Sequence, residues 1–515
     1  MNEIAMAQTD TAGVLRRGPD DALDCVPLVL GGLAGNRGAT FCRGTDGATI
    51  TFGELAGRIA AVQAWLHTQG VRPGDRVAVM MGNSVGHVAL VFALMLSRVV
   101  WIPVNTRLRE AGVRYIVEHA RPRLLVIEAG MAGVVAGLES VAVVLFPDHA
   151  GMAVGPDAGP HAQPVRPDDT LSIIYTSGTT GSPKGVLFTH RMLRIAAEAA
   201  ILVSGARAGD RMLFWEPLCH VGGAQMLMLP FLLPIELHMV DRFSAKAFWA
   251  QMREARATHL HYLGGILDIL PRGGQQAASP ESLREIWGAG ASPQAWQYFG
   301  EHMGIRLREC YGMTECASFA TVNLDGTPHS IGKPLAWIDI ELWDTEGQPV
   351  ALGEIGEMVL SSRIEGAFAA GYLDNPAASA AMAGGRLRTG DLARQDARGN
   401  FYFVGRRTDS MRVRGENVSA WEVERVFSAH PGVEASAAVG VPAAVGEQEI
   451  LLYVKPKAGM RLDPASLHEW AAAALAPFQL PRYIRLVEHF VTTPSERIRK
   501  QFLARDPAGA WDANA

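Results

Sequence analysis

The chain has 515 residues, 48% of them hydrophobic, and a formal net charge of −5 at pH 7. This length and composition exclude a disordered chain and predict at least two domains, each with a buried core. The charge balance provides no global basic surface, so nucleic acid is not an expected partner.

Cysteine usage and hydropathy favour a cytoplasmic protein. The five cysteines are scattered and form no C-x-x-C pair, a pattern that indicates neither a disulfide framework nor a zinc site. Residues 1–20 lack the layout of a secretory signal peptide and are expected to form a loose leader. The longest apolar run, Val88 to Leu96, is too short for a membrane span, so we expect a soluble protein without an integral membrane segment.

An α/β layer is predicted after the leader. Thr51 and Glu54 have the spacing of a helix capping box, and apolar residues follow at helical spacing until Gly70. The stretches RVAVMM, VALVFALMLSR, WIPVN and RLLVIEA then alternate between strand and helix character. This alternation predicts a largely parallel sheet covered by helices.

The character of the sequence changes in its last third. From IGKPLAWIDIELWDTEGQPV to GNFYFVGRRTD, short strands alternate with turns and predict a β-rich subdomain. AWEVERVFSAHPGV and ILLYVKP then predict an amphipathic helix and a strand. We therefore expect a large N-terminal domain of α/β and β-rich subdomains over residues 21–408 and a small α+β C-terminal domain over residues 409–515.

The stretch YTSGTTGSPKGV, residues 175–186, predicts an anion-binding loop. It follows the strand-like segment LSIIY and combines glycines, hydroxyl side chains and one lysine. Glycines allow close approach to the backbone, so amide N–H groups and hydroxyls can face an anion such as phosphate. The residues that would contribute are Thr176, Ser177, Gly178, Thr179, Thr180, Gly181 and Lys184.

Two other interpretations of this loop explain less. A solvated surface loop would need neither this order of residues nor the flanking strands. The P-loop pattern G-x-x-x-x-G-K-[ST] does not fit, because Gly178, Gly181 and Lys184 lie three apart and no Ser or Thr follows the lysine.

Further motifs follow the loop in a characteristic order. They are EPLCHVGG, GAGAS, YGMTE, TGDL and GRRTDSMRVRGENVSAWEVE. With the loop, they resemble the motifs of the adenylate-forming superfamily, which includes acyl-CoA synthetases, luciferases and the adenylation domains of peptide synthetases. The resemblance covers the chain from about Thr51 to Leu503, and DRFSAKAFW and RGENVS are most similar to crotonobetaine/carnitine-CoA ligases and neighbouring acyl-CoA ligases.

This resemblance implies a reaction in two steps. A carboxylate attacks the α-phosphate of ATP to give an acyl-adenylate and pyrophosphate, and a thiol, that of CoA, then displaces AMP. Negative charge must be neutralised on the phosphates and on the incoming carboxylate, which calls for cations, Mg²⁺ and oriented amides. The resemblance also implies a mobile C-terminal domain that turns about a hinge at Asp409 between the two steps.

The family's functional residues map onto matching motif positions. By resemblance, Mg²⁺ is held by Glu315 and Thr180, and a carboxylate suits this hard cation. The residues implied to act on the reacting groups are Lys184, His220, Thr314, Glu315 and Arg497. Those implied to contact ATP or CoA are Thr176, Ser177, Gly178, Thr179, Thr180, Gly181, Gly288, Ala289, Gly290, Tyr311, Gly312, Asp391, Arg406, Arg412 and Gly415. Taken alone, His220 could equally be a buried structural histidine, and Cys219 beside it is interpreted as a small core residue.

Two segments depart from the family pattern. RVRGENVS would line the pantetheine tunnel, with Arg412 in place of a common lysine and Arg414 where glycine is frequent. In TPSERIRK, Arg497 takes the position of the family's adenylation lysine, and Lys500 lies one helical turn away as an alternative. Arginine preserves the cation but not the geometry of lysine.

The resemblance predicts an AMP-forming acid–thiol ligase, and the acid stays open. Trp215, His220, Tyr262 and Trp287 could form an aromatic box for a quaternary ammonium acid such as carnitine, or they could be plain core residues. Three other functions are left open: acyl transfer to a carrier protein, a luciferase-like monooxygenase, and a nucleotide-binding homologue with impaired catalysis. The departure in TPSERIRK keeps the last of these open.

Overall fold

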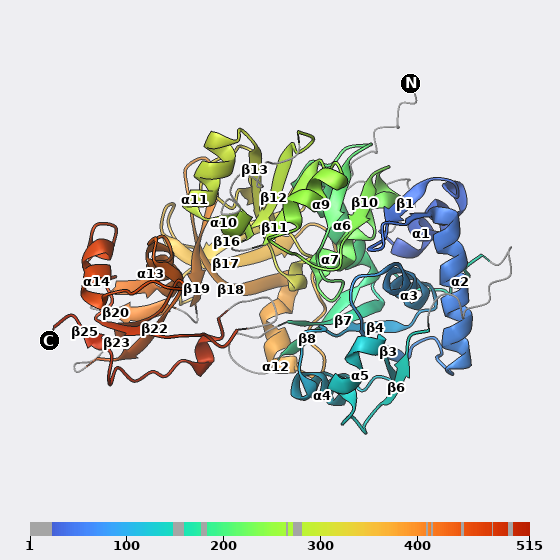
Figure 1. Cartoon of the computed structure of the whole chain (residues 1–515), viewed down its shortest axis with the longest axis horizontal. Coiled ribbons are helices and arrows are strands. Elements are labelled where there is room, and N and C mark those ends of the chain that lie inside the picture. Colours follow the sequence, from blue (N-terminus) through green and yellow to red (C-terminus); the bar gives the residue numbers. More distant parts are fainter. Residues whose placement is uncertain are drawn as a thin grey trace. The chain divides into compact units, whose positions relative to one another are not determined.

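A computed structural model describes residues 23–147, 159–176, 183–263, 266–270, 281–407, 410–413, 416–443, 448–475, 477–492 and 498–514 (Figure 1). Within these ranges, the chain divides into two compact units. The first unit comprises residues 23–176, 183–339 and 360–387, and the second comprises residues 340–359 and 388–514.

The predicted capping box begins a long helix of the first unit. Helix α2 spans Phe52–Thr68, and the Thr51 side chain accepts a hydrogen bond from the Glu54 N–H while the Glu54 carboxylate accepts one from the Thr51 N–H. The two side chains satisfy backbone donors that the first helical turn leaves without partners. The apolar face predicted for this helix is buried, through Leu55, Ile59, Val62 and Leu66.

A six-stranded sheet follows in the order β6-β5-β3-β4-β7-β8. Its strands are parallel except for β8, which pairs antiparallel with β7, so the prediction of a largely parallel sheet is confirmed. Helix α4 (Glu110–Ala120) buries its apolar face in one cluster with side chains of the sheet. The strands are β3 (Arg76–Met80), β4 (Val100–Pro103), β5 (Leu124–Ile127), β6 (Ala142–Leu145), β7 (Thr170–Thr176) and β8 (Lys184–Thr189), and α3 is Val85–Leu96.

The second sheet of this unit has nine strands in the order β15-β14-β13-β12-β11-β9-β10-β1-β2. Strands β9 to β13 are parallel, so their carboxyl ends meet at one edge of the sheet. The GAGAS and YGMTE motifs overlap the ends of β12 and β13 and continue beyond them, which places both motifs at this edge. The strands are β1 (Thr40–Arg43), β2 (Thr49–Thr51), β9 (Arg211–Phe214), β10 (Glu236–Met239), β11 (His259–Leu263), β12 (Glu285–Ala289), β13 (Arg306–Tyr311), β14 (Thr321–Val322) and β15 (Lys333–Pro334).

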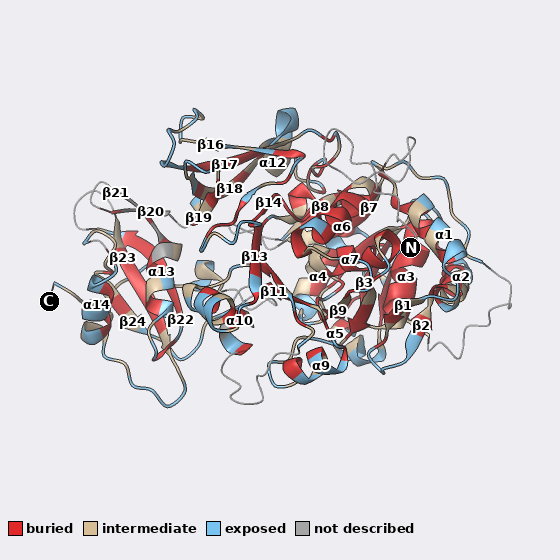
Figure 2. Ribbon diagram, turned by 90° about the horizontal axis from the view of Figure 1, so that it is seen from above, coloured by how far each residue is buried: buried red, intermediate tan, exposed pale blue. Residues whose placement is uncertain are grey.

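Helices and strands make up the buried layers of the first unit, as the red segments of Figure 2 show. In helix α3, every residue from Gly86 to Leu96 is buried. The remaining helices are α1 (Cys25–Gly35), α5 (Ala132–Val135), α6 (His190–Ser204), α7 (Val221–Met226), α8 (Leu229–Leu232), α9 (Phe248–Glu254), α10 (Ile266–Ile269), α11 (Pro293–Ala295) and α12 (Pro376–Ser379), with shorter or irregular turns at Ala129–Met131, Trp296–His302, Thr314–Cys316 and Ala380–Gly385.

The second unit contains two four-stranded sheets and one hairpin. The first sheet has the order β16-β17-β18-β19, and the second has the order β22-β23-β24-β25. Helix α13 buries Val423 and Phe427 in the core of the second sheet, which confirms the predicted amphipathic helix. The elements are β16 (Ile338–Trp343), β17 (Ile355–Ser362), β18 (Arg386–Gln395), β19 (Phe401–Arg406), β20 (Ser410–Val413), β21 (Glu416–Ser419), α13 (Ala420–Ser428), β22 (Val433–Pro442), β23 (Gln448–Pro456), α14 (Pro464–Ala472), β24 (Tyr483–Leu486), a turn at Lys500–Phe502 and β25 (Trp511–Asp512).

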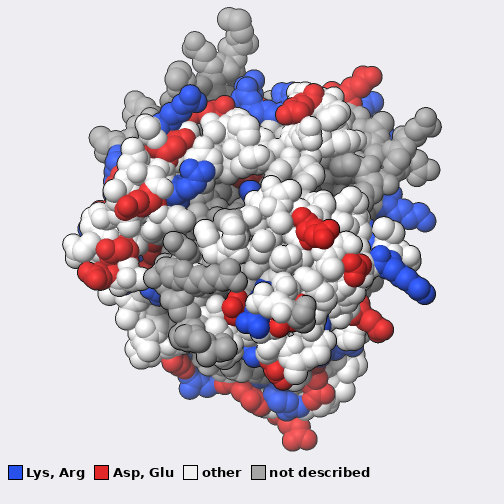
Figure 3. All heavy atoms as spheres, turned by 90° about the vertical axis from the view of Figure 1, so that its left-hand side faces the viewer, with Lys and Arg blue, Asp and Glu red and all other residues white. Residues whose placement is uncertain are grey.

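The division between the units differs from the predicted domain boundary at residue 409. Residues 340–359 and 388–407, which were assigned to the N-terminal domain, group with the rest of the second unit. The hinge at Asp409 lies outside the described residues and stays a prediction. Within the described chain, no helix is both long enough and apolar enough to cross a bilayer. On the face drawn in Figure 3, basic and acidic side chains are intermingled.

Candidate active site

The predicted phosphate loop connects two neighbouring strands. Thr176, the last residue of β7, pairs with Lys184, the first residue of β8, and Tyr175 pairs with Gly185. The loop therefore leaves and re-enters the sheet at adjacent positions. The residues between them that were predicted to bind phosphate, Ser177, Gly178, Thr179, Thr180 and Gly181, lie outside the described part of the chain.

Helix α4 fixes the two ends of this loop. The hydroxyl of Tyr115 donates a hydrogen bond of 2.9 Å to the Pro183 carbonyl. One turn further on, Nδ1 of His119 lies 2.7 Å from the hydroxyl of Tyr175. The rings of Tyr115 and His119 are stacked, with centroids 5.7 Å apart. One helix face thus holds both ends of the predicted loop.

The GAGAS segment emerges from β12 between two side chains of neighbouring strands. The register aligns Tyr262 of β11 with Gly288 and Gly288 with Glu309 of β13. A Cβ atom on Gly288 would lie 2.0 Å from the Tyr262 carbonyl oxygen, so only glycine fits there. Across this position the Tyr262 hydroxyl donates a hydrogen bond to the Glu309 carboxylate.

Glu309 also holds the backbone that follows β12. Its carboxylate accepts hydrogen bonds from the N–H groups of Gly290, at 2.5 Å, and Ala291, at 3.3 Å. Glu309 is 5% exposed. Burial raises the pKa of Glu309 to about 7, because the desolvation of the carboxylate outweighs its hydrogen bonds from Tyr262, Gly290 and Ala291. A carboxyl group with a pKa near neutrality therefore supports the GAGAS segment, whose residues are predicted to contact ATP or CoA.

The YGMTE motif forms a tight turn after β13. Tyr311 ends the strand and is buried, and a Cβ atom on Gly312 would lie 1.8 Å from the Ser318 carbonyl oxygen. Thr314 and Glu315 begin a single 3₁₀ turn, which is followed by two residues with positive φ, Ala317 at 55° and Ser318 at 79°. Such backbone is costly for residues other than glycine and is concentrated at functional sites.

Glu315 and Lys184 meet through a residue from a third segment. The hydroxyl of Tyr372 donates a hydrogen bond of 2.7 Å to Oε1 of Glu315. Lys184 Nζ lies 5.2 Å from the centroid of the Tyr372 ring. Strand β8 also contacts the turn Thr314–Cys316 directly. The structure thus brings together the lysine that ends the predicted phosphate loop and the carboxylate predicted to hold the metal.

The surroundings of Glu315 fit a divalent hard cation. Its side chain is buried, and among the described residues Tyr372 is its one hydrogen-bond partner, through Oε1. No cluster of three His, Cys, Asp or Glu side chains with metal-binding geometry occurs in the described chain. Mg²⁺ is commonly held by one or two protein carboxylates together with phosphates and water, so one carboxylate beside a phosphate loop suits it.

Two of the residues predicted to contact ATP or CoA form a separate pair in the second unit. Asp391 of β18 is aligned with Arg406 of β19, and Arg406 Nε lies 3.0 Å from Asp391 Oδ1. Asp391 is buried, and its N–H donates to Thr389 Oγ1 at 3.0 Å. The structure therefore orients this carboxylate through its backbone and through Arg406.

A family model described as AMP-binding enzyme matches residues 33–373, and one described as AMP-binding enzyme C-terminal domain matches residues 422–497. The chain belongs to the AMP-binding enzyme family. A sulfoacetate–CoA ligase from Cupriavidus necator is 32% identical to it over 476 residues, covering 88% of this chain and 92% of the relative. A crotonobetaine/carnitine–CoA ligase from Escherichia coli O157:H7 is 28% identical over 484 residues, covering 89% and 94% of the two chains.

A solved structure confirms the fold of this AMP-binding enzyme. The o-succinylbenzoate CoA synthetase from Bacillus subtilis, in complex with an acyl-adenylate intermediate, superposes with a TM-score of 0.82 at 24% identity and covers 92% of this chain and 97% of its own. The predicted α/β class, with a large N-terminal and a smaller C-terminal domain, is confirmed. The prediction of an acid–thiol ligase is also confirmed, since the relatives are CoA ligases.

The residues proposed for the acyl pocket of this AMP-binding enzyme have varied surroundings. His220 and Cys219 are both partly exposed just before α7, and desolvation raises the pKa of the Cys219 thiol to about 12. Trp215 and Tyr262 are buried in one hydrophobic cluster. Trp287 is buried, and its ring centroid lies 4.1 Å from that of His261. These contacts give the three aromatic side chains packing roles, and the aromatic box stays a prediction.

Several predicted residues near the C-terminus cannot be placed in the site. Arg497 and Gly415 lie outside the described residues, and Arg412 lies in β20 without a described side chain. Next to Arg497, Thr492 and Ile498 form an antiparallel bridge. The alternative cation, Lys500, forms an ion pair with Glu424 of α13, with Nζ 2.7 Å from Oε1.

Sequence reasoning missed Tyr372 and Glu309. Tyr372 lies in GYLDNP, whose glycine, asparagine and proline indicate only a turn. A signal for Glu309 was present in the stretch RLRECY, because a lone carboxylate requires partners where the chain is buried. The partner residues lie far away in the sequence, so the spacing of the motif could not identify them.

Proposed function

We propose that this AMP-binding enzyme is an ATP- and Mg²⁺-dependent carboxylate–CoA ligase that acts through an acyl-adenylate. The contact between Lys184, Tyr372 and Glu315 is the observation that carries the proposal. It joins a lysine at a glycine- and hydroxyl-rich loop to a buried carboxylate. Such a pair suits the recognition of a nucleotide phosphate with its metal ion.

Each group of the site would contribute to a different part of the first step. Lys184 and the N–H groups of the loop would bind phosphate oxygens of ATP, and Glu315 would hold Mg²⁺ beside them. Mg²⁺, when bound, neutralises charge on the phosphates and lets an anionic carboxylate approach. Thr314 would contact the α-phosphate, and Tyr311 would pack near the adenine. Asp391 would accept hydrogen bonds from ribose hydroxyls, with Arg406 as the second ribose contact.

In the second step, the thiol of CoA would displace AMP from the acyl-adenylate. AMP leaves an acyl-adenylate readily, whereas oxide cannot leave a free carboxylate, so activation must precede attack by the thiol of CoA. Arg412 and Gly415 would contact CoA in this step, and His220 would lie beside the acyl group. Arg497 would provide a cation for the incoming carboxylate during the first step.

For the acid, we propose a small carboxylate. The curated relatives named above are ligases of sulfoacetate and of crotonobetaine or carnitine. These acids share a small size and a second charged group, while their second charges have opposite signs. A carnitine-like acid is therefore one candidate among small acids, and acids with a positive and with a negative second charge belong in the first substrate panel.

A panel of acids tests the proposal directly. The enzyme is incubated with ATP, Mg²⁺ and each acid, with and without CoA, and AMP, pyrophosphate and acyl-CoA are measured. We expect one or more acids to give stoichiometric AMP, pyrophosphate and acyl-CoA. Lys184→Ala should lose most of this turnover, whereas the control Lys455→Ala, at an ion pair with Glu434, should keep it.

Two outcomes would redirect the assignment. Turnover with a phosphopantetheine carrier protein but not with free CoA would indicate the carrier-protein function. Binding of ATP without pyrophosphate release for any acid would indicate a nucleotide-binding homologue with impaired catalysis.

A further inference from the structure

Tyr372 contacts both charged groups on which the proposed function depends. Its hydroxyl donates to Glu315 at 2.7 Å, and its ring lies under the ammonium group of Lys184, 5.2 Å from Nζ to the centroid. The two charged groups belong to different sheets of the first unit, because Lys184 begins β8 and Glu315 follows β13. A single side chain therefore connects the two sheets at the predicted site.

The backbone holds Tyr372 in this place from both sides. On one side it forms an antiparallel bridge with Val186 of β8, and the neighbouring Leu373 donates its N–H to the Gly185 carbonyl at 2.8 Å. On the other side, the Tyr372 N–H donates to Ser379 Oγ of α12 at 2.9 Å. These hydrogen bonds fix the backbone from which the ring reaches Lys184 and Glu315.

The two contacts serve different purposes. A hydroxyl that donates to one carboxylate oxygen fixes the orientation of the carboxylate and leaves the second oxygen for a cation. Hydrogen-bond partners of this kind commonly change metal affinity by about 10- to 100-fold when they are removed. An aromatic face attracts an ammonium group while the N–H donors of that group stay available for phosphate.

We propose that Tyr372 is a positioning residue of the adenylation site: its hydroxyl orients Glu315 for Mg²⁺, and its ring holds Lys184 for the ATP phosphates. This inference rests on the proposed function and adds a residue to it. Tyr372 acts through its two neighbours and needs no contact with the reacting atoms.

Two substitutions separate the two contacts. Tyr372→Phe removes the hydroxyl and keeps the ring, so the Mg²⁺ concentration for half-maximal activity should rise about tenfold. Its KM for the acid should stay unchanged. Tyr372→Leu removes both contacts, so it should show the same Mg²⁺ defect and a further rise of about 2- to 5-fold in KM for ATP.

The second unit offers a matched control. The hydroxyl of Tyr402 also donates to a carboxylate, Asp396, at 3.1 Å, and Arg394 lies over its ring at 4.4 Å. Tyr402→Phe makes the same chemical change at a residue outside the proposed site. It should leave the Mg²⁺ requirement and the KM for ATP unchanged.

A binding measurement without turnover completes the test. Calorimetric titration with ATP, in the presence and absence of Mg²⁺, should show that Mg²⁺ strengthens ATP binding in the wild type and much less in Tyr372→Phe. A milder variant, Ser379→Ala, should give a smaller defect of the same kind. The inference is overturned if Tyr372→Phe and Tyr402→Phe show the same Mg²⁺ requirement and the same effect of Mg²⁺ on ATP binding. In that case, acid-dependent turnover of the wild type would still uphold the proposed function. Absence of acid-dependent turnover in the wild type would instead overturn the proposed function itself.

Discussion

The Tyr262 hydroxyl donates a hydrogen bond to the Glu309 carboxylate across Gly288, and this carboxylate in turn holds the N–H groups of Gly290 and Ala291. Three adjacent parallel strands thus support one turn at the carboxyl edge of the nine-stranded sheet. The support comes from a buried acid, so its strength should depend on pH.

Glu309→Gln should change the pH dependence of stability. Burial raises the pKa of Glu309 to about 7 from its ordinary value of 4.5. A raised pKa means that the folded protein holds the proton more tightly than the unfolded chain does. The stability that this group contributes is therefore fully present below about pH 4.5 and is lost as the pH rises through about 7. We expect the Tm of Glu309→Gln, relative to wild type, to rise between pH 5 and pH 8.

An exposed carboxylate provides the control for this measurement. Glu434→Gln removes a charge that lies in an ion pair with Lys455 at the surface. The Tm difference between Glu434→Gln and wild type should not show the rise between pH 5 and pH 8 that is expected for Glu309→Gln. A Tm difference for Glu309→Gln that stays constant between pH 5 and pH 8 would show that Glu309 does not titrate in this range.

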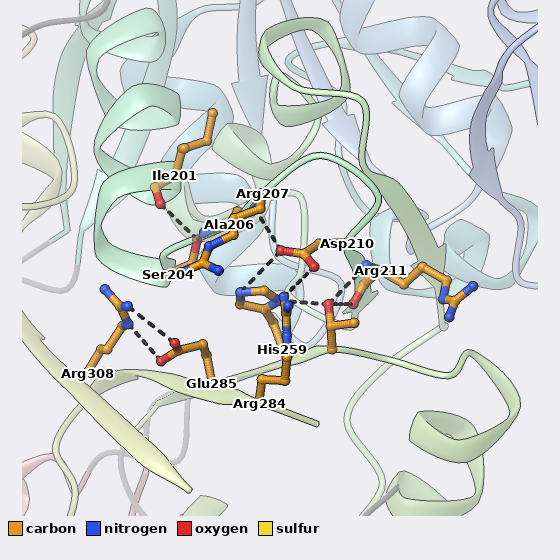
Figure 4. Close-up of polar contacts among 11 residues, drawn as sticks. Ile201, Ser204, Ala206, Arg207, Asp210, Arg211, His259, Arg284, Glu285 and Arg308 are labelled. Atoms are coloured by element: carbon orange, nitrogen blue, oxygen red, sulfur yellow. Dashed lines mark hydrogen bonds and ion pairs between the residues drawn. The ribbon is translucent and has the colours of Figure 1, made fainter. Parts of the chain in front are cut away.

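Asp210→Asn should destabilise the fold without affecting nucleotide binding. Asp210 is buried at the amino ends of the parallel strands, where it contacts Arg284, the Arg207 N–H at 2.7 Å and the His259 ring at 3.8 Å (Figure 4). Burial lowers the pKa of His259 to about 4, so this ring is neutral at pH 7. Asp210 is buried, and asparagine weakens the charged hydrogen bonds that this side chain accepts from Arg284 and from the Arg207 N–H, which should cost about 2–3 kcal/mol.

The readouts for this variant are thermal unfolding and ATP kinetics. A loss of that size should lower Tm by roughly 4–6 °C. KM for ATP should stay within about twofold of wild type, because the proposed site occupies the opposite edge of the same sheet. Arg207→Ala is the control, since Arg207 contacts Asp210 through its backbone. An altered KM for ATP at unchanged Tm would contradict this assignment.

Asp391→Asn should weaken ribose recognition. The wild-type carboxylate is oriented by Arg406 at 3.0 Å and is proposed to accept hydrogen bonds from the ribose hydroxyls. A hydrogen bond to a charged group contributes about 1.5–3 kcal/mol, so KM for ATP should rise by at least about tenfold. The variant should also discriminate less than wild type between ATP and its 2′- and 3′-deoxy analogues.

The neighbouring turn supplies a control for Asp391→Asn. Asp396 accepts hydrogen bonds within the turn between β18 and β19, from the N–H groups of Arg398 and Asn400. Asp396→Asn should keep the wild-type preference for ATP over the deoxy analogues. Unchanged discrimination in Asp391→Asn would assign Asp391 to the structure of the sheet alone.

Arg497→Ala should slow adenylation and spare thioester formation. Arg497 is proposed, by resemblance, to replace the family's adenylation lysine, so its loss should reduce acid-dependent pyrophosphate release by more than about tenfold. Transfer from a chemically synthesised acyl-adenylate to CoA should continue at the wild-type rate. Lys500→Ala should change the rate of neither step by more than about twofold, because Lys500 is paired with Glu424. If Lys500→Ala slows pyrophosphate release and Arg497→Ala does not, Lys500 is the catalytic cation.

Local sequence signals predicted local structure well. The capping box at Thr51 and Glu54 and the strands on both sides of the predicted phosphate loop were predicted, because each depends on residues within a few positions of one another. Their geometry is determined by hydrogen bonds within one element or one hairpin. Such local patterns can be recognised in a single sequence.

Relationships between distant segments could not be predicted in the same way. Tyr372 reaches Glu315 over 57 positions, and Tyr262 reaches Glu309 over 47. Both contacts depend on which strands become neighbours, and short motifs do not specify this order. For the same reason, residues 388–407 were assigned to the N-terminal domain, although their contacts group them with the second unit.

In the proposed function, a carboxylate oxygen of the acid attacks the α-phosphorus of ATP. The most direct measurement uses the acid panel with ¹⁸O in the carboxyl group and determines the mass of the AMP formed in the presence of CoA. The attacking oxygen stays on phosphorus when the thiol displaces AMP, so AMP should carry one ¹⁸O atom and pyrophosphate none. AMP without the label, or no AMP with any acid, would contradict the proposed function.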